Sequence, residues 1–218
     1  MPAGGRKVPT GWLLSEPGHD MLTCMSDLYL AQQPPADQML REDPLALLIA
    51  MLLDQQIPLE KAFMGPYILA ERLGVTRLDA ATIADHDPQD LVAIFTRPPA
   101  IHRFPGSMAE RTQKLCRAIA DSYNDDAAAV WSDVSDGKDL LKRVEALPGF
   151  GKQKAQIFVA LLGKQFGVQP AGWKEAAGTF GEDGSFRSVA DIVDAPSLSK
   201  VRDYKKQLKA AAKAAKAG

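Results

Sequence analysis

The stretch DLLKRVEALPGFGKQKAQIFVALLG, residues 139–163, decides the fold of this 218-residue chain. Apolar residues recur at helical spacing on both sides of its centre, which predicts a pair of helices within residues 137–166. Pro148 ends the first helix, while Gly149 and Gly151 allow backbone conformations that are closed to bulkier residues. The segment therefore predicts a helical hairpin with a tight, glycine-rich turn.

The second helix of this hairpin begins with amides that no large side chain covers. Because Gly151 precedes the helix, the first N–H groups and the helix dipole together form a site for an anion, with Lys152 and Lys154 beside it. Such a site holds a phosphate of DNA without reading the base sequence. An ordinary helical hairpin with a glycine-rich turn is the alternative. The residues predicted to contact DNA here are Gly149, Phe150, Gly151, Lys152 and Lys154.

Helical patterns fill most of the remaining chain, and strand patterns are nearly absent, so we expect an all-α fold. Residues 96–107 contain three prolines, and residues 167–187 are rich in glycine, so both are expected to be loops, the second with at most a short helix. Asp43-Pro44 pairs an N-cap with a proline at the first helical position. The other expected helices cover approximately residues 17–33, which Pro34-Pro35 ends, 44–56, 58–74, 79–85, 88–96, 108–123 and 197–214.

Composition excludes several classes of protein. Apolar residues make up 46 % of the chain and charged residues 24 %, which is ordinary for a folded domain and excludes wholesale disorder. No apolar run reaches the roughly 18 residues of a membrane-spanning helix, and the first residues lack the apolar core of a signal peptide, so we expect no membrane partner and a cytoplasmic location. Cys24 and Cys116 cannot form a disulfide scaffold or a four-thiolate site, and the histidines lack ligand spacing, so no metal or cofactor is expected.

The last nineteen residues differ from the rest in charge. Residues 200–218 carry a net charge of +6, whereas the whole chain carries −1. Val201 and Leu208 give the first part of this segment a weak apolar stripe, and the cations form a field suited to DNA phosphates. Solubility alone is the alternative reading. The lysines predicted to contact DNA are Lys205, Lys206 and Lys209.

Two motifs carry a resemblance to a known family. LPGFGKQKA (147–155) closely resembles the helix–hairpin–helix of the HhH-GPD superfamily of base-excision DNA glycosylases, the relatives of endonuclease III. LLIAMLLDQQIPLEKAF (47–63) resembles the early core helix of that superfamily, whose typical form runs LLIAVLLSAQ. The resemblance spans roughly residues 40–170 and implies a two-lobed helical domain, which we place at residues 17–196. A flexible N-terminus (1–16) precedes it, and the basic C-terminal helix or tail (197–218) follows.

The resemblance also implies roles for particular residues. In the family, a polar residue at the end of the early core helix fills the space of an extruded base; by position this is Gln56, with Gln55 beside it. Exposed amides at a helix end are the alternative. The position of the lysine used by bifunctional members holds Gln153, which cannot form a Schiff base, so β-lyase activity is not expected. The iron–sulfur cysteines of many members are also absent.

The carboxylate that glycosylase chemistry requires is less easily placed. The usual aspartate position falls near Ala171, where this chain has none. Two substitutes are nominated: Glu175, about one turn further on, and Asp54, at the end of the early core helix. Each could instead be an ordinary surface or helix-end residue. Trp173 is nominated to stack on an extruded base.

These features together predict a monofunctional DNA N-glycosylase. Such an enzyme would bind double-stranded DNA as a monomer, associated with the nucleoid, and would hydrolyse the bond between a damaged or mispaired base and its sugar. A non-catalytic helix–hairpin–helix binder of damaged or structured DNA is the main alternative. A protein-interaction module without a DNA role is a third reading.

Overall fold

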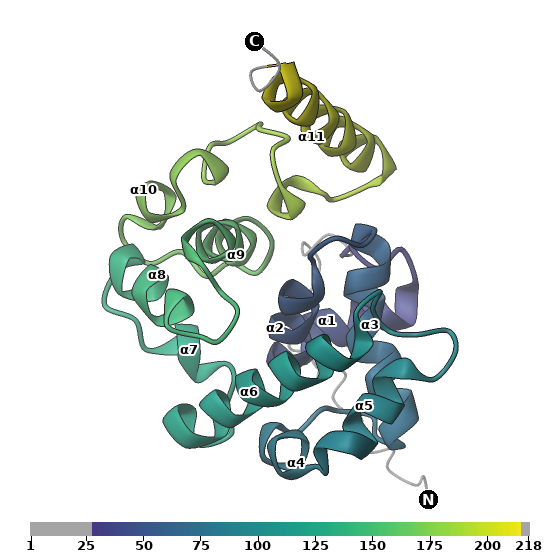
Figure 1. Cartoon of the computed structure of the whole chain (residues 1–218). Helices are drawn as coiled ribbons and strands as arrows, with labels where there is room; N and C mark the ends of the chain where they lie inside the picture. Colours follow the sequence, from purple (N-terminus) through teal and green to yellow (C-terminus); the bar gives the residue numbers. More distant parts are fainter. Residues whose placement is uncertain (1–27, 215–218) are drawn as a thin grey trace, which may run out of the picture.

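A computed structural model describes residues 28–214, and over that range the chain is built of helices joined by turns and loops, without strands (Figure 1). The prediction of an all-α fold is therefore confirmed. The α-helices are α1 (Pro34–Glu42), α2 (Pro44–Leu53), α3 (Leu59–Leu73), α4 (Ala80–Asp85), α5 (Pro88–Thr96), α6 (Pro105–Tyr123), α7 (Ala129–Ser132), α8 (Gly137–Glu145), α9 (Lys152–Gln165), α10 (Trp173–Ala177) and α11 (Ala195–Ala214). Two 3₁₀ turns, η1 (Gly178–Phe180) and η2 (Val189–Asp191), precede α11.

Local signals fix many of the helix ends. The Asp43 carboxylate accepts the N–H groups of Leu45 and Ala46 at the start of α2, as expected of an N-cap residue followed by proline. Gly74 ends α3 in the left-handed conformation, at φ 71°. The predicted loop over residues 96–107 is confirmed only for residues 97–104, because Thr96 still belongs to α5 and Pro105 begins α6.

The prediction of a helix over residues 17–33 is wrong where it is testable. Residues 28–33 are not helical, and Pro34-Pro35 begin α1 rather than end a helix, because proline is tolerated in the first turn, where no intrahelical N–H is needed. The buried Asp37 carboxylate accepts the N–H groups of Leu30 and Ala31 and thereby fixes the entering chain. Residues 17–27 and the predicted flexible segment 1–16 lie outside the described residues.

The described helices pack as two groups (Figure 1). The first contains α1 to α6 and surrounds α2, which is apolar on every face and buried from Leu45 to Leu53. The second contains α7 to α10 with η1 and η2, and α9 is its central helix. α8 and α9 form the predicted hairpin, and its turn faces the C-terminal end of α2.

α11 crosses the end of the molecule next to η2 (Figure 1). Leu198 and Val201 are buried at its docked end, and Arg202 pairs with Glu60 of α3 at 3.1 Å. The prediction of a C-terminal helix is confirmed. Within residues 28–214, none of the helices combines the length and the apolar character needed to cross a bilayer.

Candidate nucleic-acid interface

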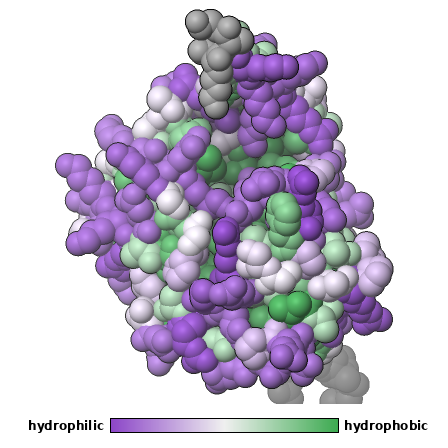
Figure 2. Space-filling model, viewed as in Figure 1, coloured by the Kyte–Doolittle hydropathy of each residue, from purple (hydrophilic) through white to green (hydrophobic). Residues whose placement is uncertain are grey.

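A cleft of about 930 Å³ lies between the turn that follows α2 and the last helix, α11. Its apolar floor is formed by residues from both groups of helices. Figure 2 shows this hydrophobic floor below the hydrophilic surface of α11. Cationic and polar side chains surround the apolar floor. The residues of the apolar floor include Ile57, Ile157, Ile192, Leu198 and Val201. The residues of the rim include Asp54, Gln55, Gln56, Arg103, Lys205, Lys206 and Lys209.

Asp54 brings a carboxylate to this cleft. It follows the last residue of α2, and its N–H donates to Ala50 O at 3.0 Å. Burial raises the pKa of the Asp54 carboxyl above its ordinary value, and the charges of Lys205 and Lys154 oppose that rise. Of the two carboxylates nominated from the sequence, Asp54 is therefore the one that lines the cleft, partly desolvated and beside cations.

Lys154 has a different role from the predicted phosphate contact. Its Nζ donates hydrogen bonds to the carbonyls of Met51 at 2.6 Å and Leu52 at 3.1 Å. Burial lowers the pKa of the Lys154 ammonium to about 8. Lys154 thus caps the C-terminal end of α2 and fastens α9 to it. This corrects the expectation: the side chain leaves the surface because the end of α2 lies next to the first turn of α9.

The two glutamines after Asp54 behave differently from each other. The Gln55 side chain donates to Leu52 O at 2.7 Å and accepts from Arg111 at 3.0 Å, so it is held by the scaffold. Gln56 is exposed and has a left-handed backbone, at φ 58°. Non-glycine residues in this conformation are costly and concentrate at functional sites. At the rim of the cleft the turn therefore presents an exposed Gln56 side chain, whereas the Gln55 side chain is held by its hydrogen bonds.

The hairpin turn has the geometry that an anion site requires. Phe150 N–H donates to Leu147 O at 3.1 Å, and Gly149 has φ 87°, which makes this a tight turn with glycine where only glycine is unstrained. Gly151 and Lys152 are exposed, and no side chain caps α9. Within residues 28–214, no acceptor is found for the amides of Gly151, Lys152 or Gln153. These N–H groups are therefore left without an acceptor at the exposed start of α9.

The side chain of Phe150, by contrast, does not reach the surface. It is 2 % exposed and packs edge-on against Phe158, with ring centroids 5.8 Å apart. Its predicted contact with DNA is therefore limited to the backbone. The ring instead anchors the turn to α9.

Trp173 and Glu175 do not belong to this cleft. Trp173 is buried at the start of α10, where its ring lies against Gly163 so closely that a Cβ there would fall 2.4 Å from the ring. The ring is buried against α9 outside this cleft, so the cleft gives no support to the predicted stacking on a base. Glu175 is exposed on α10, which packs on α8 and α9, and it does not line the cleft. The geometry of the cleft therefore gives no support to its nomination as a catalytic carboxylate, which stays a prediction.

Two residues of the proline-rich loop were missed from the sequence. Arg103 lines the cleft, and its guanidinium lies 5.0 Å from the centre of the Phe104 ring. Phe104 is 45 % exposed, so its ring lies at the surface beside Arg103. Arg72 fixes this loop by donating to the carbonyls of Ile94 and Pro99. An aromatic and a cation between prolines were the available signal for an exposed tip.

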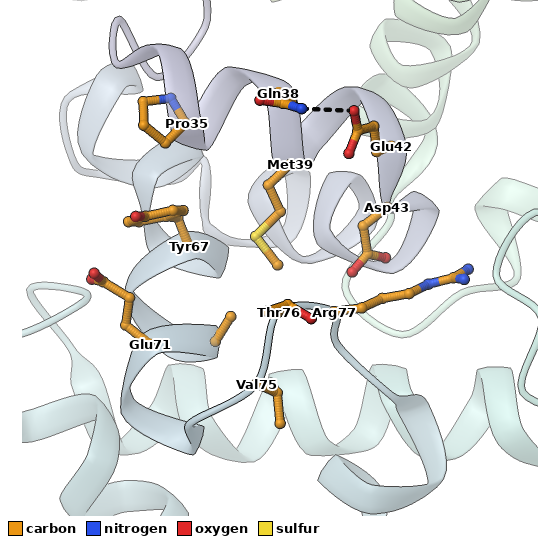
Figure 3. Close-up of a pocket in the computed structure, with 11 residues that line it drawn as sticks. Pro35, Gln38, Met39, Glu42, Asp43, Tyr67, Glu71, Val75, Thr76 and Arg77 are labelled. Carbon is orange, nitrogen blue, oxygen red and sulfur yellow. Dashed lines mark hydrogen bonds between the residues drawn. The ribbon is translucent and has the colours of Figure 1, made fainter.

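A second hollow, of about 640 Å³, lies beside α1 and α3 (Figure 3). The Asp43 carboxylate faces it together with Met39 and Tyr67. That carboxylate already accepts hydrogen bonds from the N–H groups of Leu45, Ala46 and Leu78, so its role is structural. This hollow has no free buried polar group, and we assign it no role.

Comparison with known proteins adds no identity. No family model, no curated protein and no solved structure matches this chain. Within residues 28–214, no three His, Cys, Asp or Glu side chains gather as a metal site. The functional interpretation therefore depends on the two sequence motifs and on the geometry of the cleft.

Proposed function

We propose that this protein binds duplex DNA across the hairpin turn and the cleft, and hydrolyses the N-glycosidic bond of a base extruded into the cleft. The position of Asp54 is the observation that carries the proposal. It places a partly desolvated carboxylate on a cationic cleft, and Lys154 from the first turn of α9 reaches the same end of α2. A two-lobed fold of the HhH-GPD glycosylase type would account for this arrangement.

Each part of the interface has a separate task in this proposal. The amides of Gly151 to Gln153, with Lys152, hold a backbone phosphate. Gln56 and the Arg103–Phe104 tip enter the space that the extruded base leaves. Water adds its oxygen to the sugar carbon as the bond to the base breaks, and the base leaves with a proton. The Asp54 carboxylate stabilises the positive charge that develops on the sugar.

No β-lyase step is proposed. The position used for Schiff-base formation carries Gln153, and the Lys154 ammonium is occupied by the carbonyls at the end of α2. The product would be an intact strand with an abasic site. Strand breaks should therefore appear only after alkali.

The activity test is a panel of duplexes containing uracil, oxidised guanine, alkylated adenine or a mismatch. We expect strand breaks after alkali on at least one member of the panel, and none without alkali. Binding without breaks on any member would favour the non-catalytic binder of damaged DNA. Failure to bind any duplex even at low salt would favour a protein-interaction module.

The exposed lysines of α11 provide a further prediction. Replacing Lys205, Lys206 and Lys209 together by Gln should weaken duplex binding about 10- to 100-fold at low salt and flatten its salt dependence, because three phosphate contacts are lost. Fluorescence anisotropy over a salt series measures both quantities.

The matched control removes the same number of positive charges from surfaces outside the cleft. Lys114, Lys138 and Lys174 are exposed on other helices and do not line the cleft. Their replacement by Gln should leave both affinity and salt dependence nearly unchanged. Equal losses in the two triple variants would show that only the total charge matters, and would remove α11 from the interface.

A further inference from the structure

A fully buried histidine joins the two exposed tips of the interface. His102 is 0 % exposed, its Nε2 lies 2.9 Å from Gln55 O, and its Nδ1 lies 3.0 Å from Phe104 N. A backbone amide can only donate, so Nδ1 must be the unprotonated acceptor. Nε2 then carries the hydrogen and donates it to the Gln55 carbonyl. Both ring nitrogens are used, and the ring is neutral with one defined tautomer.

The two partners of this ring belong to different parts of the chain. Gln55 directly precedes the exposed Gln56, whereas Phe104 is itself the exposed tip of the proline-rich loop. The Gln55 side chain is also held by Arg111 of α6, so that turn has support of its own. The link from the Gln55 carbonyl to the Phe104 amide, however, runs through the imidazole ring.

We propose that His102 is a positioning residue that holds the Gln56 turn and the Arg103–Phe104 tip at a fixed spacing for DNA, and does so only in its neutral form. The inference rests on the proposed DNA-binding function of these two tips. A proton on Nδ1 would remove the acceptor of Phe104 N–H and release that tip. DNA recognition should therefore weaken when the ring is protonated.

The surroundings of the ring favour the neutral form near neutral pH. Burial lowers the pKa of His102 below its usual 6.5, and the cations Lys61 of α3 and Lys154 of α9 lower it further, against the hydrogen bond to Gln55 O. The unfolded chain then binds this proton more readily than the folded chain. The stability that the neutral ring contributes is accordingly fully present above about pH 6.5. It is lost, together with the link to Phe104, as the pH falls from there through the lowered pKa of the folded ring.

The tautomer can be tested without DNA. Long-range ¹H–¹⁵N NMR spectra of the full chain distinguish protonated from unprotonated ring nitrogens. We expect a His102 signal with Nε2 protonated and Nδ1 unprotonated at pH 7.5. A protonated Nδ1 at neutral pH would overturn the inference.

Two substitutions then separate the two links. In His102→Asn, the side-chain oxygen takes the place of Nδ1 and keeps the Phe104 link; in His102→Gln, the amide takes the place of Nε2 and keeps the Gln55 link. Each variant should bind duplex about 10-fold more weakly than the wild type at pH 7.5. Each should also lack the acid-side loss of affinity seen in the wild type. His86→Asn is the control and should match the wild type in both respects.

The outcomes distinguish this inference from the function on which it rests. If the wild type binds no duplex, the proposed function fails, whatever tautomer the ring has. If the wild type binds duplex, and both folded His102 variants match its affinity and its pH dependence of binding, the positioning role is refuted. Circular dichroism of each variant confirms that the comparison concerns folded chains.

Discussion

Replacing Asp54 with Asn should lower the single-turnover rate of base excision at least about 100-fold, while duplex affinity changes by less than about twofold. The substitution keeps the shape of the side chain and removes the charge that would stabilise the developing cation on the sugar. The binding surfaces, which are the hairpin amides and the α11 lysines, are left intact. Excision is measured by alkali cleavage of the preferred duplex, and affinity by anisotropy with the same duplex.

The pH dependence of the wild type provides a second readout on Asp54. Because burial raises the pKa of this carboxyl, the active ionised form is lost on acidification at a higher pH than for an ordinary aspartate. As the pH is lowered, the excision rate should therefore begin to fall at a higher pH than it would if the catalytic group were an exposed aspartate. In the same window the protonated form favours folding, so lost activity would not reflect unfolding at this residue.

Glu175→Gln is the matched control, because it removes a carboxylate that lies outside the cleft. It should excise at the wild-type rate. If Glu175→Gln loses activity and Asp54→Asn retains it, the assignment of Asp54 as the catalytic carboxylate is wrong.

Replacing Gly149 with Ala should destabilise the fold by about 3 kcal/mol. Gly149 has φ 87°, and a Cβ at this position would lie 2.3 Å from Leu52 Cδ1. A left-handed conformation costs a non-glycine residue about 1–2 kcal/mol, and overpacking costs a further ~1–3 kcal/mol. Leu52 cannot easily move away, because it is fully buried at the end of α2.

The measurement is chemical or thermal unfolding, with an expected drop in Tm of about 10 °C for a chain of this size. Gly151→Ala is the control. Gly151 has φ −72°, and its Cβ would meet nothing within 4 Å, so its replacement should cost only about 0.5–1 kcal/mol, the difference between glycine and alanine at an N-cap. Equal stability of the two variants would show that the hairpin turn is not docked on α2.

Local signals explain what the sequence could predict. The prolines and glycines around the hairpin, and the N-cap Asp43, determine the conformation of the chain only within a few residues on either side. The hairpin and α2 could therefore be predicted from the sequence. The prediction of a helix ending at Pro34-Pro35 was wrong because proline can begin a helix as well as end one, and here the two prolines begin α1. The structure of residues 28–33 depends on Asp37, which accepts amides from the preceding chain.

Tertiary neighbours explain what the sequence could not predict. Lys154 looks like a surface lysine until the end of α2 is placed beside it, and Trp173 looks like a loop residue until Gly163 of α9 makes room for its ring. Asp54 was nominated, but only the fold separates it from Glu175. The Arg103–Phe104 tip was missed because an irregular loop has no periodicity to read.

The hairpin amides provide the most direct test of the whole account. An NMR titration of the ¹⁵N-labelled chain with a short undamaged duplex follows each backbone N–H separately. We predict that the signals of Gly151, Lys152 and Gln153 shift together and saturably, with that of Gln56 shifting in the same titration. Saturable binding of the duplex with these four signals unmoved would contradict the account.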